Sequence, residues 1–231
     1  MVRKQGVLEG VGSVDTLSSG CFDSKKVLVT GHTGFKGSWL SLWLSRLGAE
    51  VYGYSLPSPA VSHYLIADVR ALLQGEVLAD IRKEDCLSHM IADVQPDVIF
   101  HLAAQPLVKY SYFHPVETFD VNVMGTVSLL EAVRRAGRPV VLIVVTSDKC
   151  YSTDGDAFCF REEDRLGGRD PYSASKAAVE IVCDSYRRSF FPPDRFDHHG
   201  VALATVRAGN VIGGGDFASD RIIPDIFRSI V

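Results

Sequence analysis

Short apolar runs alternate with amphipathic segments along most of this 231-residue chain. Residues 27–29 are aliphatic, and a run of apolar positions at helical spacing follows them as far as Leu47. Strands are predicted at 27–29, 51–54, 76–78, 98–102, 140–145 and 201–206, and helices near 39–47, 83–94, 116–130 and 172–190, with a short amphipathic helix at the end. This alternation predicts an α/β fold built on a doubly wound parallel sheet.

Three of these elements carry more detailed expectations. Residues 140–145 are apolar throughout, which predicts a central strand covered on both faces. In the helix at 172–190, Asp170 stands at the capping position and Pro171 at the first helical position. The buried stripe of the helix near 116–130 is predicted to consist of Val116, Phe119, Val123, Val127 and Leu130.

Composition is that of an ordinary globular domain, with 46% hydrophobic and 23% charged residues and a formal net charge of −4. The mild negative charge gives no electrostatic reason to expect nucleic acid or an anionic membrane as a partner. The densest apolar run, 140–145, is far shorter than the roughly 20 residues that span a bilayer, and the N-terminus lacks the apolar segment of a secretory signal. Five cysteines without a CxxC pair indicate thiols in a reducing cytoplasm and no metal site.

Three glycines, Gly31, Gly34 and Gly37, lie between the first predicted strand and the first helix. A dinucleotide diphosphate requires backbone without Cβ atoms so that it can approach the amides of a helix N-terminus. The spacing GxxGxxG is a variant of the Rossmann fingerprint, and its place between a strand and a helix makes it specific. The alternative is a tight turn that binds nothing.

Two further groups of residues could perform chemistry. Tyr172 and Lys176 are four apart on a helix, so a cation lies beside a phenol, as a hydride-transfer enzyme needs to take a proton from an alcohol. Residues 146–149 (Thr-Ser-Asp-Lys) end the apolar strand at 140–145, where side chains point into the ligand crevice of an α/β sheet. The alternatives are a solvated helix face and a strand end that turns into solvent.

The glycine motif, residues 101–105 and 122–126 and the Tyr172/Lys176 pair together resemble the extended short-chain dehydrogenase/reductase family. Longer strings, at 31–44, 146–151, 170–176, 207–216 and 220–225, resemble its sugar-nucleotide 4,6-dehydratases that act on CDP-glucose. The resemblance runs from about Lys25 to the last residue. Residues 1–24, which are rich in glycine and serine and lack periodicity, are predicted to be a poorly ordered leader, longer than the family normally carries. The resemblance implies a dinucleotide-binding Rossmann domain at 25–212 and, at 213–231, only the start of a smaller substrate domain that continues further in the family.

For this family, the resemblance implies an NAD-dependent, redox-neutral dehydration of CDP-D-glucose to CDP-4-dehydro-6-deoxy-D-glucose. Tyr172, helped by Lys176, would accept the O4 proton, Ser147 would hold O4, Asp148 would protonate the leaving C6 hydroxyl and Lys149 would remove the C5 proton. The implied cofactor contacts are Gly31, Thr33, Gly34, Phe35, Lys36, Gly37, Asp80, Ile81, Leu102, Ala103, Ala104, Asn122, Thr146, Tyr172 and Lys176. The implied substrate contacts are Gln105, Ser147, Asn210 and Arg221.

Several alternatives stay open from the sequence. The second strand ends at Gly53-Tyr54-Ser55, with neither the acid typical of NAD enzymes nor the arginine typical of NADP enzymes, so only the resemblance favours NAD. A C4 epimerase or reductase of the same family would use Tyr172 and Lys176 without needing Asp148 and Lys149. A non-catalytic dinucleotide-binding fragment is a third interpretation, and assembly into a homodimer is open.

Overall fold

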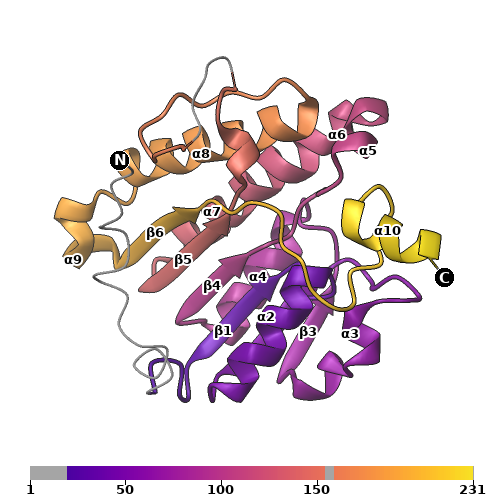
Figure 1. Ribbon diagram of the computed structural model, residues 1–231. Coiled ribbons are helices and arrows are strands. Elements are labelled where there is room, and N and C mark those ends of the chain that lie inside the picture. The colour runs from indigo at the N-terminus through magenta and orange to yellow at the C-terminus, as the bar shows by residue number, and fades with distance from the viewer. Residues whose placement is uncertain (1–19, 154–158, 231) are drawn as a thin grey trace, which may run out of the picture.

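The computed structural model describes residues 20–153 and 159–230. Its centre is a six-stranded sheet in the order β3-β2-β1-β4-β5-β6, in which every neighbouring pair is parallel (Figure 1). The strands are β1 (Lys26–Thr30), β2 (Glu50–Ser55), β3 (Gly75–Leu78), β4 (Val98–His101), β5 (Val140–Val145) and β6 (Val201–Val206). The strand order reverses between β1 and β4, so the predicted doubly wound sheet is confirmed.

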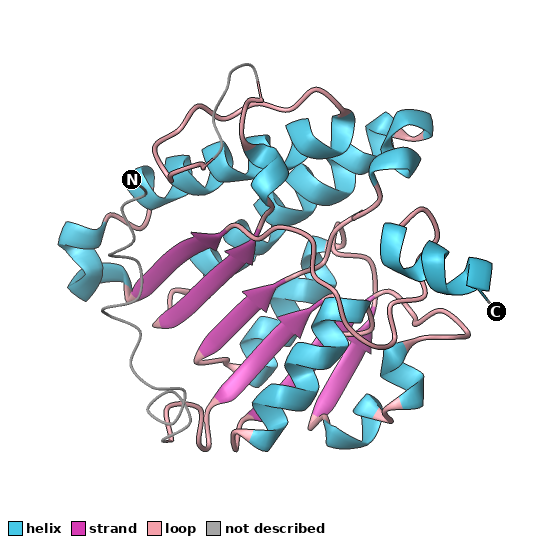
Figure 2. Ribbon diagram, viewed as in Figure 1, coloured by secondary structure: helices cyan, strands magenta, loops and turns pink. Residues whose placement is uncertain are grey.

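Helices lie on both faces of this sheet (Figure 2). One face carries α2 (Phe35–Arg46), α3 (His63–Ile66) and η1 (Val69–Leu72), and the other carries α4 (Glu84–Val94), α7 (Gly125–Ala136) and α8 (Pro171–Ser189). The shorter elements are α5 (Val108–Phe113), α6 (Pro115–Phe119), the π-helical turn η2 (Asp120–Met124), η3 (Asp148–Cys150), η4 (Pro193–Arg195), α9 (Phe196–His199) and α10 (Ile222–Ile230).

The alternation of side chains along each strand divides the interior into two cores. Val27 and Val29 of β1 point toward α2 and pack in one cluster with Leu44. Leu28 points to the opposite face and packs in the cluster that contains Leu129 of α7. Successive residues of a strand face opposite sides of a sheet, so a fully apolar β1 is what a strand covered on both sides requires.

The stripe predicted for the helix near 116–130 is wrong at its beginning. Val116 is 82% exposed and Phe119 is 39% exposed, whereas Leu130 is fully buried as predicted. The π-helical turn η2 separates α6 from α7 and adds a residue to one turn, which shifts the buried face relative to a regular helix. The residues buried along this segment include Thr118, Asn122, Gly125, Thr126, Leu129 and Val133.

Residues 140–145 form β5, but the prediction that both faces of this strand are covered is wrong. Leu142 and Val144 are buried against α7 and α8, while Val141 on the other face is 41% exposed. On the same side of β6, Ala202 and Ala204 are exposed as well. Helix α2 packs over β1 and β2, so within the described residues this part of the sheet has no helix over it.

After β6 the chain returns across the carboxyl ends of the strands toward α2 (Figure 1). There the indole Nε1 of Trp39 donates a hydrogen bond to the Gly214 carbonyl at 2.9 Å. Helix α10 follows, with Ile222, Phe227 and Ile230 exposed. The domain division at 212 and 213 stays a prediction.

At the other end of the chain, most of the predicted leader, residues 1–19, lies outside the described residues. Residues 20–24 form a turn in which Phe22 packs against the core beneath α2 and the Ser24 amide donates to the Gly48 carbonyl at 3.0 Å. Among the described helices, none combines the length and the apolar character that a membrane crossing requires.

Candidate active site

A cavity of about 270 Å³ opens at the carboxyl ends of β1 and β4, where the strand order reverses. Open α/β sheets bind their ligands at this point, because the connections on either side of it run to opposite faces. Most of the predicted cofactor residues line the cavity: Gly31, Thr33, Gly34, Phe35, Lys36, Gly37, Asp80, Ile81, Leu102, Ala103 and Ala104. The sequence therefore predicted the greater part of its wall.

The glycine loop at the floor of this cavity depends on its missing side chains. Gly31 has φ +76°, and a Cβ there would lie 2.7 Å from the Ala103 nitrogen. A Cβ on Gly37 would lie 2.1 Å from the Gly31 carbonyl oxygen. Gly34 is exposed, caps α2 without a side-chain hydrogen bond and leaves the first-turn amides directed at the cavity. This bare, amide-rich floor fits the diphosphate of a dinucleotide.

One side of the cavity is formed where β2 ends. The hydroxyl groups of Thr33 and Ser55 are hydrogen-bonded at 2.8 Å, and Thr33 also donates to the Leu56 carbonyl at 2.9 Å. Ser55 thus stands where Rossmann enzymes commonly carry the residue that reads the ribose 2′ position. Because the single hydrogen of the Thr33 hydroxyl goes to the Leu56 carbonyl, Ser55 donates to Thr33, and its oxygen can accept from a ribose hydroxyl.

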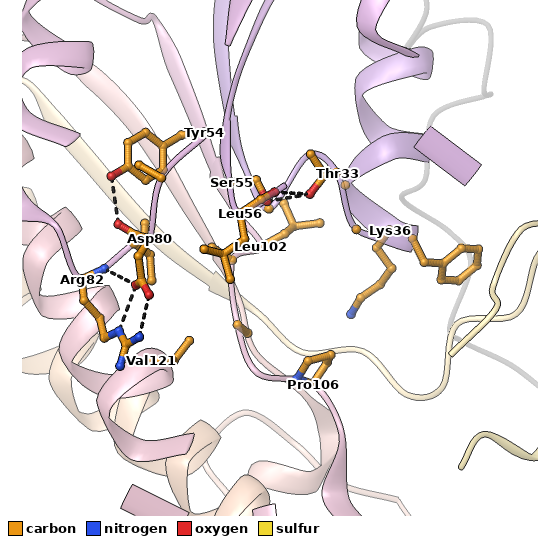
Figure 3. Close-up of a pocket in the computed structure, with 18 of the residues that line it drawn as sticks. Thr33, Lys36, Tyr54, Ser55, Leu56, Asp80, Arg82, Leu102, Pro106 and Val121 are labelled. Atoms are coloured by element: carbon orange, nitrogen blue, oxygen red, sulfur yellow. Dashed lines mark hydrogen bonds and ion pairs between the residues drawn. The ribbon is translucent and has the colours of Figure 1, made fainter. Parts of the chain in front are cut away.

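Beyond β3, a carboxylate and a guanidinium form a fixed pair at the cavity wall (Figure 3). Arg82 donates to Asp80 through Nε at 2.9 Å and through Nη2 at 2.6 Å, and its Nη1 donates to Asp120 at 2.7 Å. The hydrogen bonds and the charge of Arg82 lower the pKa of the Asp80 carboxyl. Because the Asp80 and Asp120 carboxylates already balance its charge, the Arg82 guanidinium would attract a phosphate only weakly.

The sequence did not identify several residues of this wall. They are Tyr54, Ser55, Leu56, Ala79, Arg82, Pro106, Glu117 and Val121. Ser55 and Leu56 could have been found, because they directly follow a predicted strand at the ligand-binding edge. Glu117 and Val121 belong to α6 and η2, and nothing in the sequence predicts that this interrupted helix reaches the cavity.

A buried histidine supports the opposite wall. His101, the last residue of β4, hydrogen-bonds the Thr30 hydroxyl through Nδ1 at 2.7 Å and the Thr126 hydroxyl through Nε2 at 3.1 Å. Burial, together with the positive charge of Lys176, lowers the pKa of His101 to about 3, so the ring is neutral at ordinary pH. Thr30 in turn accepts from the Ala103 amide at 3.2 Å, which fixes the backbone that lines the cavity.

A second cavity, of about 1080 Å³, adjoins the first. Lys36, Pro106 and Arg221 line both, so the two cavities share part of their wall. Figure 3 shows the Lys36 side chain extending from the start of α2 toward Pro106, on the opposite side of the view from Asp80 and Arg82. Of the predicted catalytic and substrate residues, those that line the second cavity are Ser147, Lys149, Tyr172, Asn210 and Arg221.

Tyr172 lines this cavity from the start of α8, and Lys176 lies buried one turn further along the helix. Asp170 caps the helix by accepting from the Ser173 amide at 3.0 Å, as predicted. Burial raises the pKa of the Tyr172 phenol, and the neighbouring Ser147 hydroxyl and Arg221 guanidinium oppose that rise. Burial and the charge of Lys36 lower the pKa of Lys176 to about 8, while its Nζ donates to the Val145 carbonyl at 3.2 Å. Ionisation of the phenol therefore depends on the hydrogen bonds and positive charges around it.

Ser147, Asp148 and Lys149 follow β5 directly. Ser147 caps the short helix η3 by accepting from the Lys149 amide at 3.2 Å, and its hydroxyl donates to Asp148 at 3.1 Å. The Lys149 ammonium lies 3.9 Å from the Asp148 carboxylate and donates to the Asn210 side-chain oxygen at 3.3 Å. A carboxylate and an amine thus lie side by side, and of the two only Lys149 is among the residues that line the second cavity.

Asn122 and Gln105 hold the wall together from behind. The Asn122 amide group donates to the Gln105 carbonyl at 3.2 Å and to the Ser175 hydroxyl at 2.8 Å, and its oxygen accepts from the Gln105 amide at 2.7 Å. The Gln105 side chain bonds Thr118 and the Leu107 backbone. Neither residue is among those that line the two cavities, so their predicted ligand contacts stay predictions.

Thr146 and Lys176, two further predicted cofactor contacts, do not line the first cavity. Thr146 lines the second cavity, but its hydroxyl is engaged with Glu180 and the Val206 carbonyl. Lys176 is buried beneath the site. In the part of the chain that the structure describes, no group of His, Cys, Asp or Glu residues is arranged to hold a metal ion.

Comparisons with known proteins agree with this geometry. The family model described as GDP-mannose 4,6 dehydratase matches residues 28–193. CDP-glucose 4,6-dehydratase of Salmonella typhimurium is 52% identical over 209 residues, which are 90% of this chain and 58% of that protein. UDP-glucose 4-epimerase of Mycolicibacterium smegmatis is 36% identical, with 87% of this chain and 70% of that protein covered.

Solved structures show the same fold. UDP-glucose 4-epimerase of Thermus thermophilus, solved in complex with NAD, matches with a TM-score of 0.67 and 28% identity over 84% of this chain and 58% of that chain. This chain therefore spans a little more than half the length of some of the proteins it matches. From the glycine loop to α8, its site lies within the residues that the family model matches. The chain belongs to the GDP-mannose 4,6-dehydratase family of NAD-dependent nucleotide-sugar epimerases and dehydratases.

Proposed function

We propose that this chain carries the NAD-binding and catalytic part of a 4,6-dehydratase that acts on CDP-glucose. The observation that carries the proposal is that one member of each of two pairs lines the same cavity: Tyr172, which precedes the buried Lys176 by one helical turn, and Lys149, whose ammonium lies 3.9 Å from the Asp148 carboxylate. The first pair suits oxidation of an alcohol, and the second suits removal of water. The choice of CDP-glucose follows the relative from Salmonella typhimurium, which is 52% identical.

The part of the first cavity formed by Ser55, Asp80 and Arg82, where the adenosine of the cofactor would lie, favours NAD over NADP. The hydroxyl of Ser55 suits a ribose hydroxyl, and Arg82, which lines the same cavity, is already paired with Asp80 and Asp120. A 2′-phosphate would therefore meet a carboxylate and find no unpaired guanidinium at Arg82.

The first chemical step is oxidation at C4 of the sugar. The bound nicotinamide ring supplies the hydride acceptor for C4 and later the hydride donor for C6. Tyr172, as the phenolate, accepts the O4 proton, and the Lys176 ammonium beneath the site stabilises that phenolate. Ser147, which contacts the Tyr172 phenol, is placed to hold O4 during the transfer.

The second step is loss of water across C5 and C6. The C4 ketone acidifies the C5 proton, which passes to the neutral amine of Lys149, while the C6–O bond breaks and Asp148 as the acid protonates the departing hydroxyl. Hydride return to C6 and a proton to C5 complete a reaction with no net oxidation.

A C4 epimerase has no use for this second pair, and that difference provides the test. In Lys149→Met, C4 oxidation should persist, because Tyr172 and Lys176 are intact. Formation of the 4-keto-6-deoxy product should fall by about 10²–10⁴-fold, the usual contribution of a positioned base. Reduced nicotinamide should accumulate on the protein, and deuterium from solvent should fail to enter C5.

The matched control is Lys25→Met, which removes an exposed lysine paired with Asp97 at the opposite end of β1. Its product yield and deuterium incorporation should equal those of the unmodified chain. If Lys149→Met also kept wild-type incorporation and yield, another group would have to be the base, and the dehydratase assignment of this pair would be lost.

A further inference from the structure

A buried ion pair joins α8 to the ends of β5 and β6. The Glu180 side chain is 4% exposed, and its carboxylate accepts from Arg207 Nη2 at 2.9 Å and from the Thr205 hydroxyl at 2.9 Å. It also accepts a hydrogen bond from Thr146. Three side chains thus donate hydrogen bonds to one buried carboxylate. Burial alone would raise the pKa of Glu180, but these hydrogen bonds and the guanidinium charge lower it.

Arg207 makes two further contacts besides the one with Glu180. Its guanidinium lies over the Tyr151 ring, 4.8 Å from the centroid, and its Nη1 donates to the Glu162 carbonyl at 3.0 Å. The side chain is 16% exposed. A planar guanidinium that stacks on a ring and bonds two oxygens has a defined orientation, so the backbone that carries it is fixed as well.

The backbone on both sides of this pair leads directly to the proposed catalytic groups. Thr146 immediately precedes Ser147, and Lys176 lies one turn before Glu180 on α8. Arg207 immediately precedes Ala208, whose carbonyl accepts from the Asp148 amide at 3.0 Å. Two residues further on, Asn210 accepts from Lys149. The pair therefore lines neither of the two cavities described above but connects to both sets of reacting groups.

We propose that Glu180 and Arg207 are positioning residues that align the elimination pair, Asp148 and Lys149, with the oxidation pair on α8, an inference that rests on the proposed function. The four catalytic groups come from two elements, the end of β5 and the start of α8. Glu180 links these two elements through Thr146, in addition to the hydrogen bond from Lys176 to the Val145 carbonyl, and Arg207 extends the link to the loop whose Ala208 and Asn210 bond Asp148 and Lys149. Misplacement by about 1 Å at a reacting centre can cost about a hundredfold in rate.

The competing interpretation is that Glu180 and Arg207 only stabilise the fold, and the two interpretations predict different results when both partners are replaced together. A buried ion pair replaced on both sides by apolar residues of similar size is commonly as stable as before, whereas loss of one partner leaves an unpaired buried charge. The double variant Glu180→Met/Arg207→Met is therefore the informative one. It removes the ion pair between α8 and the end of β6 without leaving an unpaired buried charge.

The control is a second ion pair on the same helix. Arg188 Nε lies 2.8 Å from the Asp184 carboxylate, and both side chains are exposed. The variant Asp184→Met/Arg188→Met makes the same chemical change one turn further along α8, away from the cavities. It should leave every measured quantity within about twofold, as expected of an exposed pair.

In the Glu180→Met/Arg207→Met variant, we expect kcat for the 4-keto-6-deoxy product to fall by about 10–100-fold. The KM for the nucleotide sugar, the affinity for NAD and the midpoint of thermal unfolding should stay close to those of the unmodified chain. Wild-type kcat in a variant of wild-type stability would overturn the proposal. A fall in kcat with unchanged unfolding midpoint is the result that stability alone does not produce.

Hydrogen exchange at the Asp148 amide gives a second readout that needs no turnover. That amide is hydrogen-bonded to Ala208, so the double variant should exchange it about tenfold faster relative to the β5 amides, as a local opening would. Unchanged exchange would overturn the positioning role even if the chain turned over no nucleotide sugar. Absence of product from the unmodified chain would instead contradict the proposed function.

Discussion

Replacing Tyr172 with phenylalanine is expected to lower the rate of C4 oxidation by about 10²–10⁴-fold, because the variant loses the group that accepts the O4 proton. The ring stays, and the side chain is buried at the start of α8, so packing should change little. The step is measured as single-turnover formation of reduced nicotinamide after mixing the NAD-loaded chain with CDP-glucose. Affinity for NAD, measured by calorimetry, should be unchanged.

Tyr186→Phe provides the matched control. Tyr186 belongs to the same helix, and its phenol donates to Glu131 at 2.8 Å, at the end of α8 away from the cavities. Removal of that hydroxyl should alter stability slightly and leave oxidation intact. If Tyr172→Phe oxidised the sugar at the rate of Tyr186→Phe, the base would have to lie elsewhere, and the role of the Tyr172/Lys176 pair would be refuted.

The second large effect is expected at the glycine loop. Gly34 has φ −76° and ψ 167°, which valine adopts readily, and a Cβ there would contact only the Gly31 carbonyl, at 3.3 Å. Gly34→Val should therefore fold, while its side chain occupies the path of the diphosphate. We expect NAD to bind about a hundredfold more weakly, a loss of about 2.7 kcal/mol.

Calorimetric titration with NAD and a thermal unfolding curve together check this result. Gly214→Ala is the control, because Gly214 lines only the second cavity and has nothing within 4 Å of an added Cβ. Gly37→Ala would be a poor substitute for Gly34→Val, since its Cβ would collide with the Gly31 carbonyl and the loop itself would move. Undiminished NAD affinity in Gly34→Val would contradict the assignment of this loop.

The sheet could be predicted from sequence because its strands are short apolar runs bounded by polar or glycine residues. β1, β5 and β6 lie where the pattern places them, and the order of the elements follows from their alternation. The π-helical turn η2 could not be predicted, because inserting one residue in a helical turn leaves the hydrophobic pattern nearly unchanged. The exposed face of β5 was missed for another reason: an apolar strand does not reveal whether a helix covers it.

Some residues of the site could likewise be predicted from sequence, and others could not. The glycine loop carries its own signal, since three glycines between a strand and a helix serve a close approach of backbone to ligand. Arg82 and Glu117 carry none, because they reach the cavity only through the path of the chain after β3 and the path of α6. The tie from Glu180 to Arg207 joins residues 27 positions apart and becomes visible only when β6 is placed beside β5. Assembly into a homodimer stays a prediction.

The central claim is that oxidation and elimination occur at one site, and isotope transfer tests it most directly. CDP-glucose carrying deuterium at C4 is incubated with the NAD-loaded chain, and the product is analysed by mass spectrometry and NMR. The account predicts a 4-keto-6-deoxy sugar in which the C4 deuterium has moved to C6, and in a parallel reaction of unlabelled substrate in deuterated water, deuterium at C5. Deuterium that returns to C4, with an inverted sugar and no label at C6, would show an epimerase and contradict the account.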